Sequence, residues 1–292
     1  MGTTPGTASQ PPAPPPSEDI VKITTWNVQN ASPQRSAAQA SWLAGTDAQV
    51  LVLTEVSPTH DTLAQQLSAH GFSTYTPVPT YPHIGDYRVV LACRGADLVA
   101  TPEALPDYMP HRCALATIRL STSRAAEASR GPTRRTELVV AGLYVPSRGP
   151  QSRRNVDKRA FQSAVATWLP ALVGAAQVGT TVVIAGDLNV VEPGHVPHHV
   201  VFGAWEYDFY RSFAAAGFAD AYRDLHPVTV AHSWFGRRSN AGYRFDHLFT
   251  GIDQRQHLLA CEYDHSPRTG GLSDHAALSA HLLLSTPGTH TT

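Results

Sequence analysis

The sequence has few cysteines, no long apolar run and almost no net charge. Its three cysteines, Cys93, Cys113 and Cys261, are widely spaced, which argues against a disulfide framework and for a reducing compartment. No Cys-x-x-Cys pair occurs, which disfavours a zinc–thiolate site. No apolar run approaches a membrane span, and the N-terminus does not resemble a signal peptide. These absences predict a soluble, cytoplasmic protein.

The formal net charge is only −1, so overall charge does not predict binding to a polyanion. The basic residues are nevertheless clustered, and a local cluster can bind phosphate whatever the net charge. The alternative for either cluster is a solvated surface. The two clusters are Arg119, Arg124, Arg130, Arg134 and Arg135, and Arg148, Arg153, Arg154, Lys158 and Arg159.

Composition predicts one domain with two tails. Residues 1–19 are rich in Pro, Ser, Thr and Ala and are expected to form a disordered tail. Residues 286–292 have the same character. No comparable linker lies between the tails, which predicts a single catalytic domain over residues 20–285.

Apolar runs and helical patterns alternate inside this domain, which indicates an α/β class. Ser57 and Pro58 are expected to begin the second helix, and Pro170 to kink the third. Residues 121–136 are expected to form a long basic loop between two hairpin strands. The expected strands are 20–28, 48–56, 87–93, 112–120, 137–145, 180–186, 243–251, 257–264 and 276–284; the expected helices are 33–45, 57–71, 152–177 and 205–217.

Polar residues stand where several of these apolar strands end. The run 181–186 leads into Asp187 and Asn189, which project to the same side of an extended chain because they are two residues apart. A buried carboxylate is costly without a partner. In a layered α/β protein, strand ends are also where ligands bind. The other strand-end residues are Asn27, Glu55, Tyr144, Asp246, Asp274 and His275.

This collection predicts a site for a hard metal ion. Oxygen ligands without thiolates suit Mg²⁺ or Mn²⁺, and a His beside carboxylates offers a stabilised imidazolium. Taken singly, the residues have structural alternatives. Asn27 could form a turn, Asp246 could pair with Arg244, and Tyr144 could be a core aromatic.

The order of the motifs "WNV", "LTEV", "LYVPS", "GDLNV", "YRFDHL" and "SDH" across residues 21–283 resembles the endonuclease/exonuclease/phosphatase superfamily. The resemblance implies a four-layer α/β sandwich, with two face-to-face mixed β-sheets flanked by helices. It places the active site at one end of the sheets, and it favours a monomer.

The resemblance also implies roles for the strand-end residues. Glu55 would be the main metal ligand, with Asn27 beside it and Asp274 as a further ligand. Asp187 would orient or deprotonate the attacking water. The remaining roles concern the phosphate: Asn189 would hold Asp187 and contact the phosphate, His275 oriented by Asp246 would bind its oxygens, and Tyr144 would approach it or the leaving group.

Residues 217–250 resemble the exonuclease III and apurinic/apyrimidinic endonuclease branch. By that resemblance Trp234, Tyr243 and Phe245 would line a pocket for a flipped-out abasic sugar. Arg237 and Arg238 would contact backbone phosphates. The alternative is that the three aromatic residues belong to the core.

The chain departs from this branch at several positions. Gln29 and Asn30 stand where the branch usually has an acid or Asn followed by Gly, and Thr54 stands where it has Gln. The segment after "GDLNV" is short. Its His195, His198 and His199 are expected to lie in a surface loop, with a second metal site as the alternative.

Together these features predict a Mg²⁺- or Mn²⁺-dependent phosphodiesterase that hydrolyses DNA, as an abasic-site endonuclease, a 3′–5′ exonuclease or both. One alternative is a phosphatase or phosphodiesterase acting on a small nucleotide, a lipid headgroup or another small phosphoester. Another is an inactive binding module, which would have no need for the complete set of acids and His.

Overall fold

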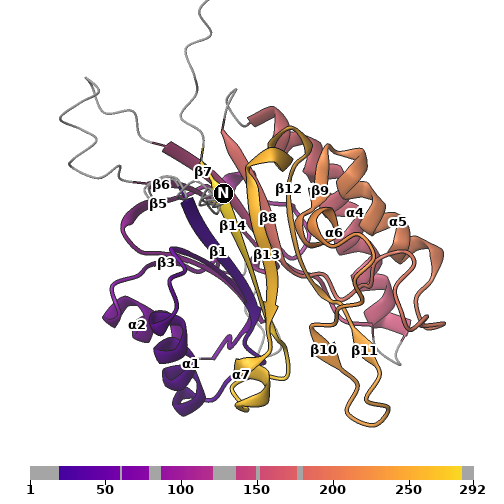
Figure 1. The fold of residues 1–292 in the computed structure, drawn as a ribbon, viewed down its shortest axis with the longest axis horizontal. Coiled ribbons are helices and arrows are strands. Elements are labelled where there is room, and N and C mark those ends of the chain that lie inside the picture. The colour runs from indigo at the N-terminus through magenta and orange to yellow at the C-terminus, as the bar shows by residue number, and fades with distance from the viewer. Residues whose placement is uncertain are drawn as a thin grey trace, which may run out of the picture.

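Two six-stranded β-sheets face each other, and helices cover their outer faces (Figure 1). The computed structural model describes residues 20–59, 61–78, 87–120, 136–148, 152–175 and 180–284. The expected tails, and all but the last residue of the expected basic loop at 121–136, lie outside these residues. Two mixed sheets flanked by helices confirm the predicted α/β sandwich.

The first sheet has the strand order β13-β14-β1-β2-β4-β3. Strands β1 and β2 run parallel and their other neighbours run antiparallel. The bounds are β1 Ile20–Asn27, β2 Val50–Val56, β3 Ser73–Tyr75, β4 Arg88–Cys93, β13 Leu258–Asp264 and β14 Ala277–Leu283.

The second sheet has the order β5-β6-β7-β8-β12-β9, with β7 and β8 parallel. A separate two-stranded hairpin, β10 and β11, lies near the lower end of the molecule in Figure 1. The bounds are β5 Ala96–Ala100, β6 Cys113–Leu120, β7 Thr136–Tyr144, β8 Thr181–Asp187, β9 Phe218–Asp220, β10 Trp234–Phe235, β11 Gly242–Tyr243 and β12 Asp246–Gly251.

The α-helices and short 3₁₀ segments connect these strands. In Figure 1 the helices α1 and α2 lie on one side of the paired sheets, and α4 and α5 lie on the other. The bounds are α1 Pro33–Gly45, α2 Thr62–Ala69, α4 Ser152–Ala175, α5 Ala204–Ala215, α6 Ala221–Leu225 and α7 Ser266–Thr269, with 3₁₀ segments η2 Pro102–Ala104, η3 Pro110–Arg112 and η4 Ile252–His257. No helix among the described residues is both long and apolar enough to cross a membrane.

Three apolar layers hold the sandwich together. Side chains such as Val52 and Val183 fill the space between the sheets. Leu43 of α1 packs against the outer face of the first sheet, and Phe161 of α4 packs against that of the second. Because both faces of the central strands are covered, strands such as β8 are apolar and buried along their whole length.

The start of one helix differs from the sequence prediction, while the kink expected at Pro170 stays a prediction. Helix α2 begins at Thr62 with Asp61 at its N-cap, so the prediction of Ser57 as N-cap is wrong. The Ser57 hydroxyl instead accepts a hydrogen bond from the Thr59 amide at 3.3 Å, which forms a local turn before the helix. Pro170 lies inside α4, which the structure describes as one helix from Ser152 to Ala175.

Candidate active site

The register of the second sheet brings three of the strand-end residues together. Tyr144 on β7 pairs with Asp187 on β8, and Asp246 on β12 pairs with the same Asp187 from the other side. In the first sheet Asn27 on β1 pairs with Thr54, the residue before Glu55 on β2. These strand ends form one site because the two sheets pack face to face.

Asp187 is the centre of this site and is only 1% exposed. Its Oδ1 accepts a hydrogen bond from the Asn189 amide at 2.8 Å, and its Oδ2 accepts bonds from Asn27 Nδ2 at 2.8 Å and Asn189 Nδ2 at 3.1 Å. Burial, followed by the charge of Asp246, raises the pKa of Asp187 to about 7. A carboxyl group that titrates near neutral pH is suited to accept a proton.

Asn27 connects Asp187 to Glu55. Its Nδ2 also donates to Glu55 Oε2 at 3.0 Å, while its Oδ1 accepts from the Gln29 amide at 2.8 Å. A direct bond from Asn27 to a metal would therefore use the second lone pair of Oδ1. The structure places Asn27 between the two carboxylates and turns its donor toward both.

The backbone around these residues is strained. Glu55 has φ of 55° and Asn189 has φ of 49°, and Gln29 and Asn30 also have positive φ. This left-handed region is uncommon for residues other than glycine, and residues held there often cluster at functional sites. The unusual Gln29–Asn30 pair thus adopts a conformation that glycine would adopt without strain.

His275 forms a buried pair with Asp246. Its Nδ1–H donates to Asp246 Oδ2 at 2.7 Å. Burial alone would lower the pKa of His275, but the charge of Asp246 and this hydrogen bond raise it to about 9. The interpretation of Asp246 as a partner of Arg244 is therefore wrong.

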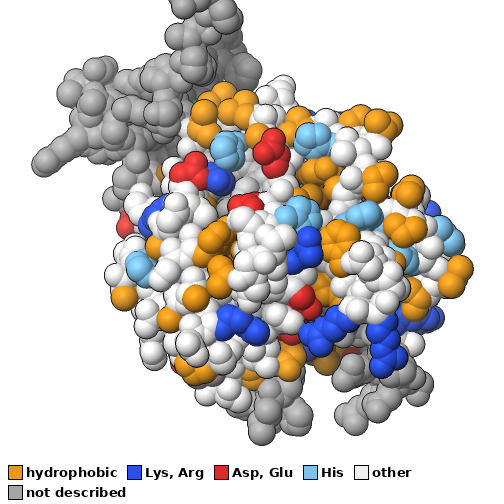
Figure 2. All heavy atoms as spheres, turned by 60° about the horizontal axis from the view of Figure 1, so that its bottom comes forward, with side chains coloured by type: hydrophobic (Ala, Val, Ile, Leu, Met, Phe, Trp, Pro, Cys, Tyr) orange, Lys and Arg blue, Asp and Glu red, His pale blue; other side chains and the backbone are white. Residues whose placement is uncertain are grey.

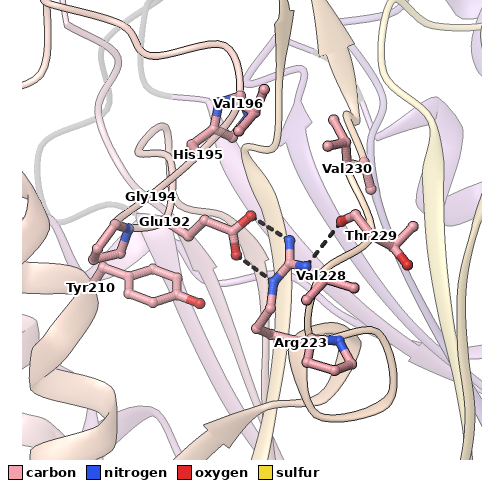
Figure 3. Close-up of a pocket in the computed structure, with 12 residues that line it drawn as sticks. Glu192, Gly194, His195, Val196, Tyr210, Arg223, Val228, Thr229 and Val230 are labelled. Carbon is pink, nitrogen blue, oxygen red and sulfur yellow. Dashed lines mark hydrogen bonds and ion pairs between the residues drawn. The ribbon is translucent and has the colours of Figure 1, made fainter.

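Arg244, two residues before β12, is fully buried. It binds Glu192 at 2.5 Å and Asp220 at 2.8 Å. Arg223 also binds Glu192, through two hydrogen bonds that are drawn in Figure 3. Glu192 and Arg223, but not Arg244, line a pocket of about 530 Å³ that also includes residues of the loop after β8.

Arg112 is a site residue that the sequence analysis missed. Its guanidinium carbon lies 4.6 Å from the centre of the Tyr144 ring. Its Nε and Nη1 are buried and have no hydrogen-bond partner among the residues that the structure describes. Burial, followed by the charge of Glu55, raises the pKa of Tyr144 well above its usual value, so the phenol keeps its proton. In the sequence, Arg112 is the first residue of the expected strand 112–120, in which no site residue was expected.

Asp274 lies at the edge of the site. Its Oδ2 accepts a hydrogen bond from the Trp234 indole at 3.0 Å and is 3.9 Å from Arg237 Nη2. An isolated bridge between Trp234 and His275 brings the β10–β11 hairpin against the catalytic residues. Asp274 is therefore oriented by the same aromatic residue that was expected to bind the sugar.

The donor set fits a hard divalent cation. The ligand atoms of Asp187, Asp246 and His275 lie within 4.8 Å of one another, and Asp246 Oδ1 is buried without a hydrogen-bond partner. These three residues are those expected to act on water and phosphate, whereas the residues expected to bind metal are Glu55, Asn27 and Asp274. Carboxylates with no thiolate suit Mg²⁺ or Mn²⁺.

The three aromatic residues expected to form a substrate pocket lie together and are partly exposed. Tyr243 stacks against Phe245 at 5.0 Å, and Trp234 lies 5.4 Å from Tyr243 and 5.7 Å from Phe245, measured between ring centres. Trp234 lies 6.4 Å from the His275 ring. This cluster borders the catalytic residues and keeps partial access to solvent, unlike the fully buried core aromatics.

Arg237 and Arg238 lie in the exposed connection between β10 and β11, and the Arg237 side chain is 78% exposed. Figure 2 brings this end of the molecule forward and shows several Lys and Arg side chains across its lower half. Lys158, by contrast, is fully buried and pairs with Glu206 at 2.7 Å, so it is not part of a solvated basic surface. Arg119 pairs with Glu137 on the second sheet.

The expectation of a surface loop for the histidines after β8 is wrong for two of them. His195 and His199 are buried, and only His198 is exposed. His195 uses both ring nitrogens, since Nδ1–H donates to Pro197 O and Nε2 accepts from the Arg244 amide. His199 donates from Nε2 to Gly242 O and stacks on Tyr243 at 3.8 Å. These bonds tie the loop to the β10–β11 hairpin.

A comparison with protein families agrees with the fold. A model of the Endonuclease/Exonuclease/phosphatase family matches residues 24–275, and the chain belongs to this family. No protein of curated function matches the sequence significantly.

Several solved structures share the fold. The 3′–5′ exonuclease NExo from Neisseria meningitidis has a TM-score of 0.70 and 22% identity, covering 90% of this chain and 99% of that one. An AP endonuclease from Archaeoglobus fulgidus has a TM-score of 0.68 and 20% identity, covering 89% and 98%. The APE2 catalytic domain from Xenopus laevis has a TM-score of 0.69 and 19% identity, covering 92% and 94%.

Proposed function

We propose that this protein is a Mg²⁺- or Mn²⁺-dependent phosphodiesterase that cleaves DNA at abasic sites, at 3′ ends or at both. The observation that carries the proposal is the buried Asp246–His275 pair next to Asp187, with a partly exposed aromatic cluster directly beside it. The first part is suited to hydrolyse a phosphodiester, and the second to hold a sugar that lacks its base.

In this proposal the metal belongs on the Glu55 side of the site. His275 is protonated at neutral pH because its pKa is about 9, and an imidazolium has no free lone pair for a metal. Glu55, with Asn27 and Asp274, would hold the ion. When bound, the ion supplies positive charge that offsets the negative charge developing on the phosphate.

The residues of the chain would perform the remaining steps. Asp187, held by Asn27 and Asn189, accepts a proton from water as the water oxygen bonds to phosphorus. The bond from phosphorus to the 3′ oxygen breaks, and that oxygen takes a proton from water to become a hydroxyl. His275 and Arg112 donate hydrogen bonds to the phosphate oxygens, and Tyr144 donates to the phosphate or the leaving oxygen.

Two observations support DNA as the substrate. Arg237 and Arg238 are exposed on the hairpin that carries Trp234 and Tyr243, where they would contact the backbone on either side of the reacting phosphate. One structural relative, described as the 3′ phosphatase NExo from Neisseria, was solved bound to a product DNA hairpin. We also propose a monomer in a reducing, cytoplasmic setting, which the three free buried cysteines support.

A cleavage assay tests the proposal. Purified protein with Mg²⁺ or with EDTA is offered three end-labelled duplexes, one with a single abasic analogue, one with a recessed 3′ end, and one blunt and undamaged. We expect metal-dependent incision at the abasic site or resection of the 3′ end. Cleavage of none of the three, with turnover of a small phosphoester, would overturn DNA as the substrate.

A further inference from the structure

The loop between β8 and α5 ends in a small apolar tip that points away from the protein. Val200 is 91% exposed and Val201 is 47% exposed. Exposed valines are common singly, but these two lie between anchored neighbours. His199 on one side and Phe202 on the other are both buried.

Both anchors contact the aromatic cluster. The His199 ring is stacked on Tyr243 at 3.8 Å with an interplanar angle of 10°. Phe202 packs edge-on against Tyr243 at 6.4 Å and Phe245 at 6.1 Å. The tip is therefore held at a fixed place relative to the candidate sugar pocket.

Hydrogen bonds also fix the rest of the loop to the residues around the β10–β11 hairpin. His232, which precedes β10, donates from Nε2 to Val196 O at 2.8 Å. His199 donates to Gly242 O at 2.9 Å, on the strand that carries Tyr243. These hydrogen bonds connect the loop to the β10–β11 hairpin. The residues on either side of the tip therefore hold it in position, although the two valines are themselves exposed.

A row of neighbouring aromatic and histidine rings runs from His275 to the residues on either side of the loop tip. His275 is followed by Trp234, then by Tyr243 and Phe245, then by His199 and Phe202. In Figure 2 hydrophobic and His side chains gather on the right of the face that holds this end of the molecule. A duplex whose phosphate reached His275 would place its neighbouring bases beside this row.

We propose that Val200 and Val201 form an apolar wedge that enters the base stack of duplex DNA beside the nucleotide held in the aromatic pocket. The inference rests on the proposed function: it assigns two residues beside the same site to the unstacking of the bases next to the bound nucleotide. Apolar side chains that enter a base step unstack it, and the unfavourable unstacking is offset by new contacts. The His199–Tyr243 stack couples the wedge to the pocket.

The test compares three variants of the full-length protein. Val200→Ser with Val201→Ser removes the apolar tip, and Val200→Leu with Val201→Leu keeps it apolar. Val228→Ser is the matched control, because Val228 is 89% exposed but lies in the neighbouring loop against Arg223, away from the aromatic cluster. None of these residues belongs to the catalytic machinery.

Two readouts are measured for each protein. The first is 2-aminopurine fluorescence from a base next to an abasic analogue in a duplex, without metal, which rises when that base unstacks. The second is metal-dependent incision of the same abasic analogue in duplex and in single-stranded DNA. A single strand has no base pairs to open. A loss of incision on duplex alone therefore indicates a loss of unstacking, and a loss on both substrates indicates a loss of catalysis.

We expect the double serine variant to lose most of the fluorescence rise and about tenfold in kcat/KM on duplex, with little change on single strands. The double leucine variant and Val228→Ser should behave like the wild type. The wedge is overturned if the wild type gives no fluorescence rise, or if the serine variant keeps it. If the fluorescence depends on the valines but no substrate is incised, the wedge stands and the proposed activity falls.

Discussion

The Nδ1 atom of His275 lies 2.7 Å from Oδ2 of Asp246, and both side chains are buried. The carboxylate charge overcomes the effect of burial and keeps the imidazole protonated at neutral pH. With Nδ1–H used by Asp246, the second ring N–H is left to bind a phosphate oxygen. In the proposed function, this pairing favours binding of phosphate by His275 and binding of the metal by the oxygen ligands around Glu55.

Replacing Asp246 by Asn should lower the pKa of His275. The wild-type value is about 9, because the charge of Asp246 and its hydrogen bond outweigh burial; without that charge the pKa should fall, with Asp187 and Asp274 left as the groups that oppose burial. NMR titration of the ring nitrogens in the metal-free protein measures this. Asp253→Asn, a change of an exposed acid, should leave the titration unchanged. Titration of His275 near 9 in Asp246→Asn would refute the argument.

The same pKa predicts the alkaline limit of activity. A group that acts as a cation is fully present below its pKa and is lost as the pH rises through it. The kcat of the wild type should therefore fall as the pH rises through about 9. In Asp246→Asn the remaining activity, expected to be lower by about 100-fold or more, should show no such fall at that pH. A wild-type kcat that is flat to well above this pH would contradict the assignment.

Arg112 should contribute strongly to catalysis although it is not a metal ligand. Its Nε and Nη1 are buried without partners beside Tyr144, and an anionic phosphate oxygen would satisfy them. Arg112→Ala should lower kcat/KM by about 10- to 100-fold, the value of a hydrogen bond to a charged group. Arg112→Lys should recover only part of the lost kcat/KM, since an ammonium group lacks the planar, two-pronged set of donors of a guanidinium. Arg119→Ala, which breaks only the pair with Glu137, should have little effect; equal losses for Arg112 and Arg119 would refute the role.

The sequence was sufficient to predict most strands and the residues at their ends. Strands such as β2 and β8 are covered on both faces, so they appear in the sequence as continuous apolar runs. A polar residue at the end of such a run is conspicuous, and this is how Glu55 and Asp187 were found. The start of α2 was missed by four residues because Ser57 and Pro58 form a turn that has the same residue types as a helix start.

Other parts of the site depend on pairings that one sequence does not contain. Arg112 reaches Tyr144 because β6 and β7 pair so that Cys113 lies opposite Leu143. His199 looked like a residue of a surface loop, yet it is buried on Tyr243, a residue far along the chain. Arg244 is only two residues from Asp246 in sequence, yet it pairs with Glu192 and Asp220, which are far from it along the chain.

The metal dependence of activity should distinguish the role of Glu55 from that of Asp187. Glu55→Gln removes a charged oxygen ligand, so it should raise the Mg²⁺ concentration for half-maximal activity by about tenfold or more. Asp187→Asn should lower kcat by about 1,000-fold with a smaller change in that concentration. Activity is measured against Mg²⁺ and Mn²⁺ concentration after treatment with a chelator. A Glu55→Gln enzyme with the wild-type requirement for metal would show that the ion lies elsewhere in the site.

The buried pair of Lys158 and Glu206 should couple stability to the active site. Lys158 Nζ lies 2.7 Å from Glu206 Oε1 and 2.8 Å from the carbonyl oxygen of Asn189, whose left-handed backbone it holds in place. Lys158→Met removes one of the two cations that pair with the buried Glu206 carboxylate, leaving Arg148 and the Gly203 amide, and should lower the free energy of unfolding by about 3 kcal/mol.

Combining Lys158→Met with Glu206→Gln removes both charges and should restore part of that free energy, because no buried charge is left uncompensated. Neither protein should regain full activity, since the Asn189 carbonyl still lacks its partner. Urea unfolding measures the change in the free energy of unfolding, and kcat measures the loss of activity. Lys22→Met, which breaks an ion pair whose Asp47 partner is exposed, is the control and should cost less than about 1 kcal/mol. If Lys158→Met is no more destabilising than Lys22→Met, or if the double variant has wild-type kcat, Lys158 does not position Asn189.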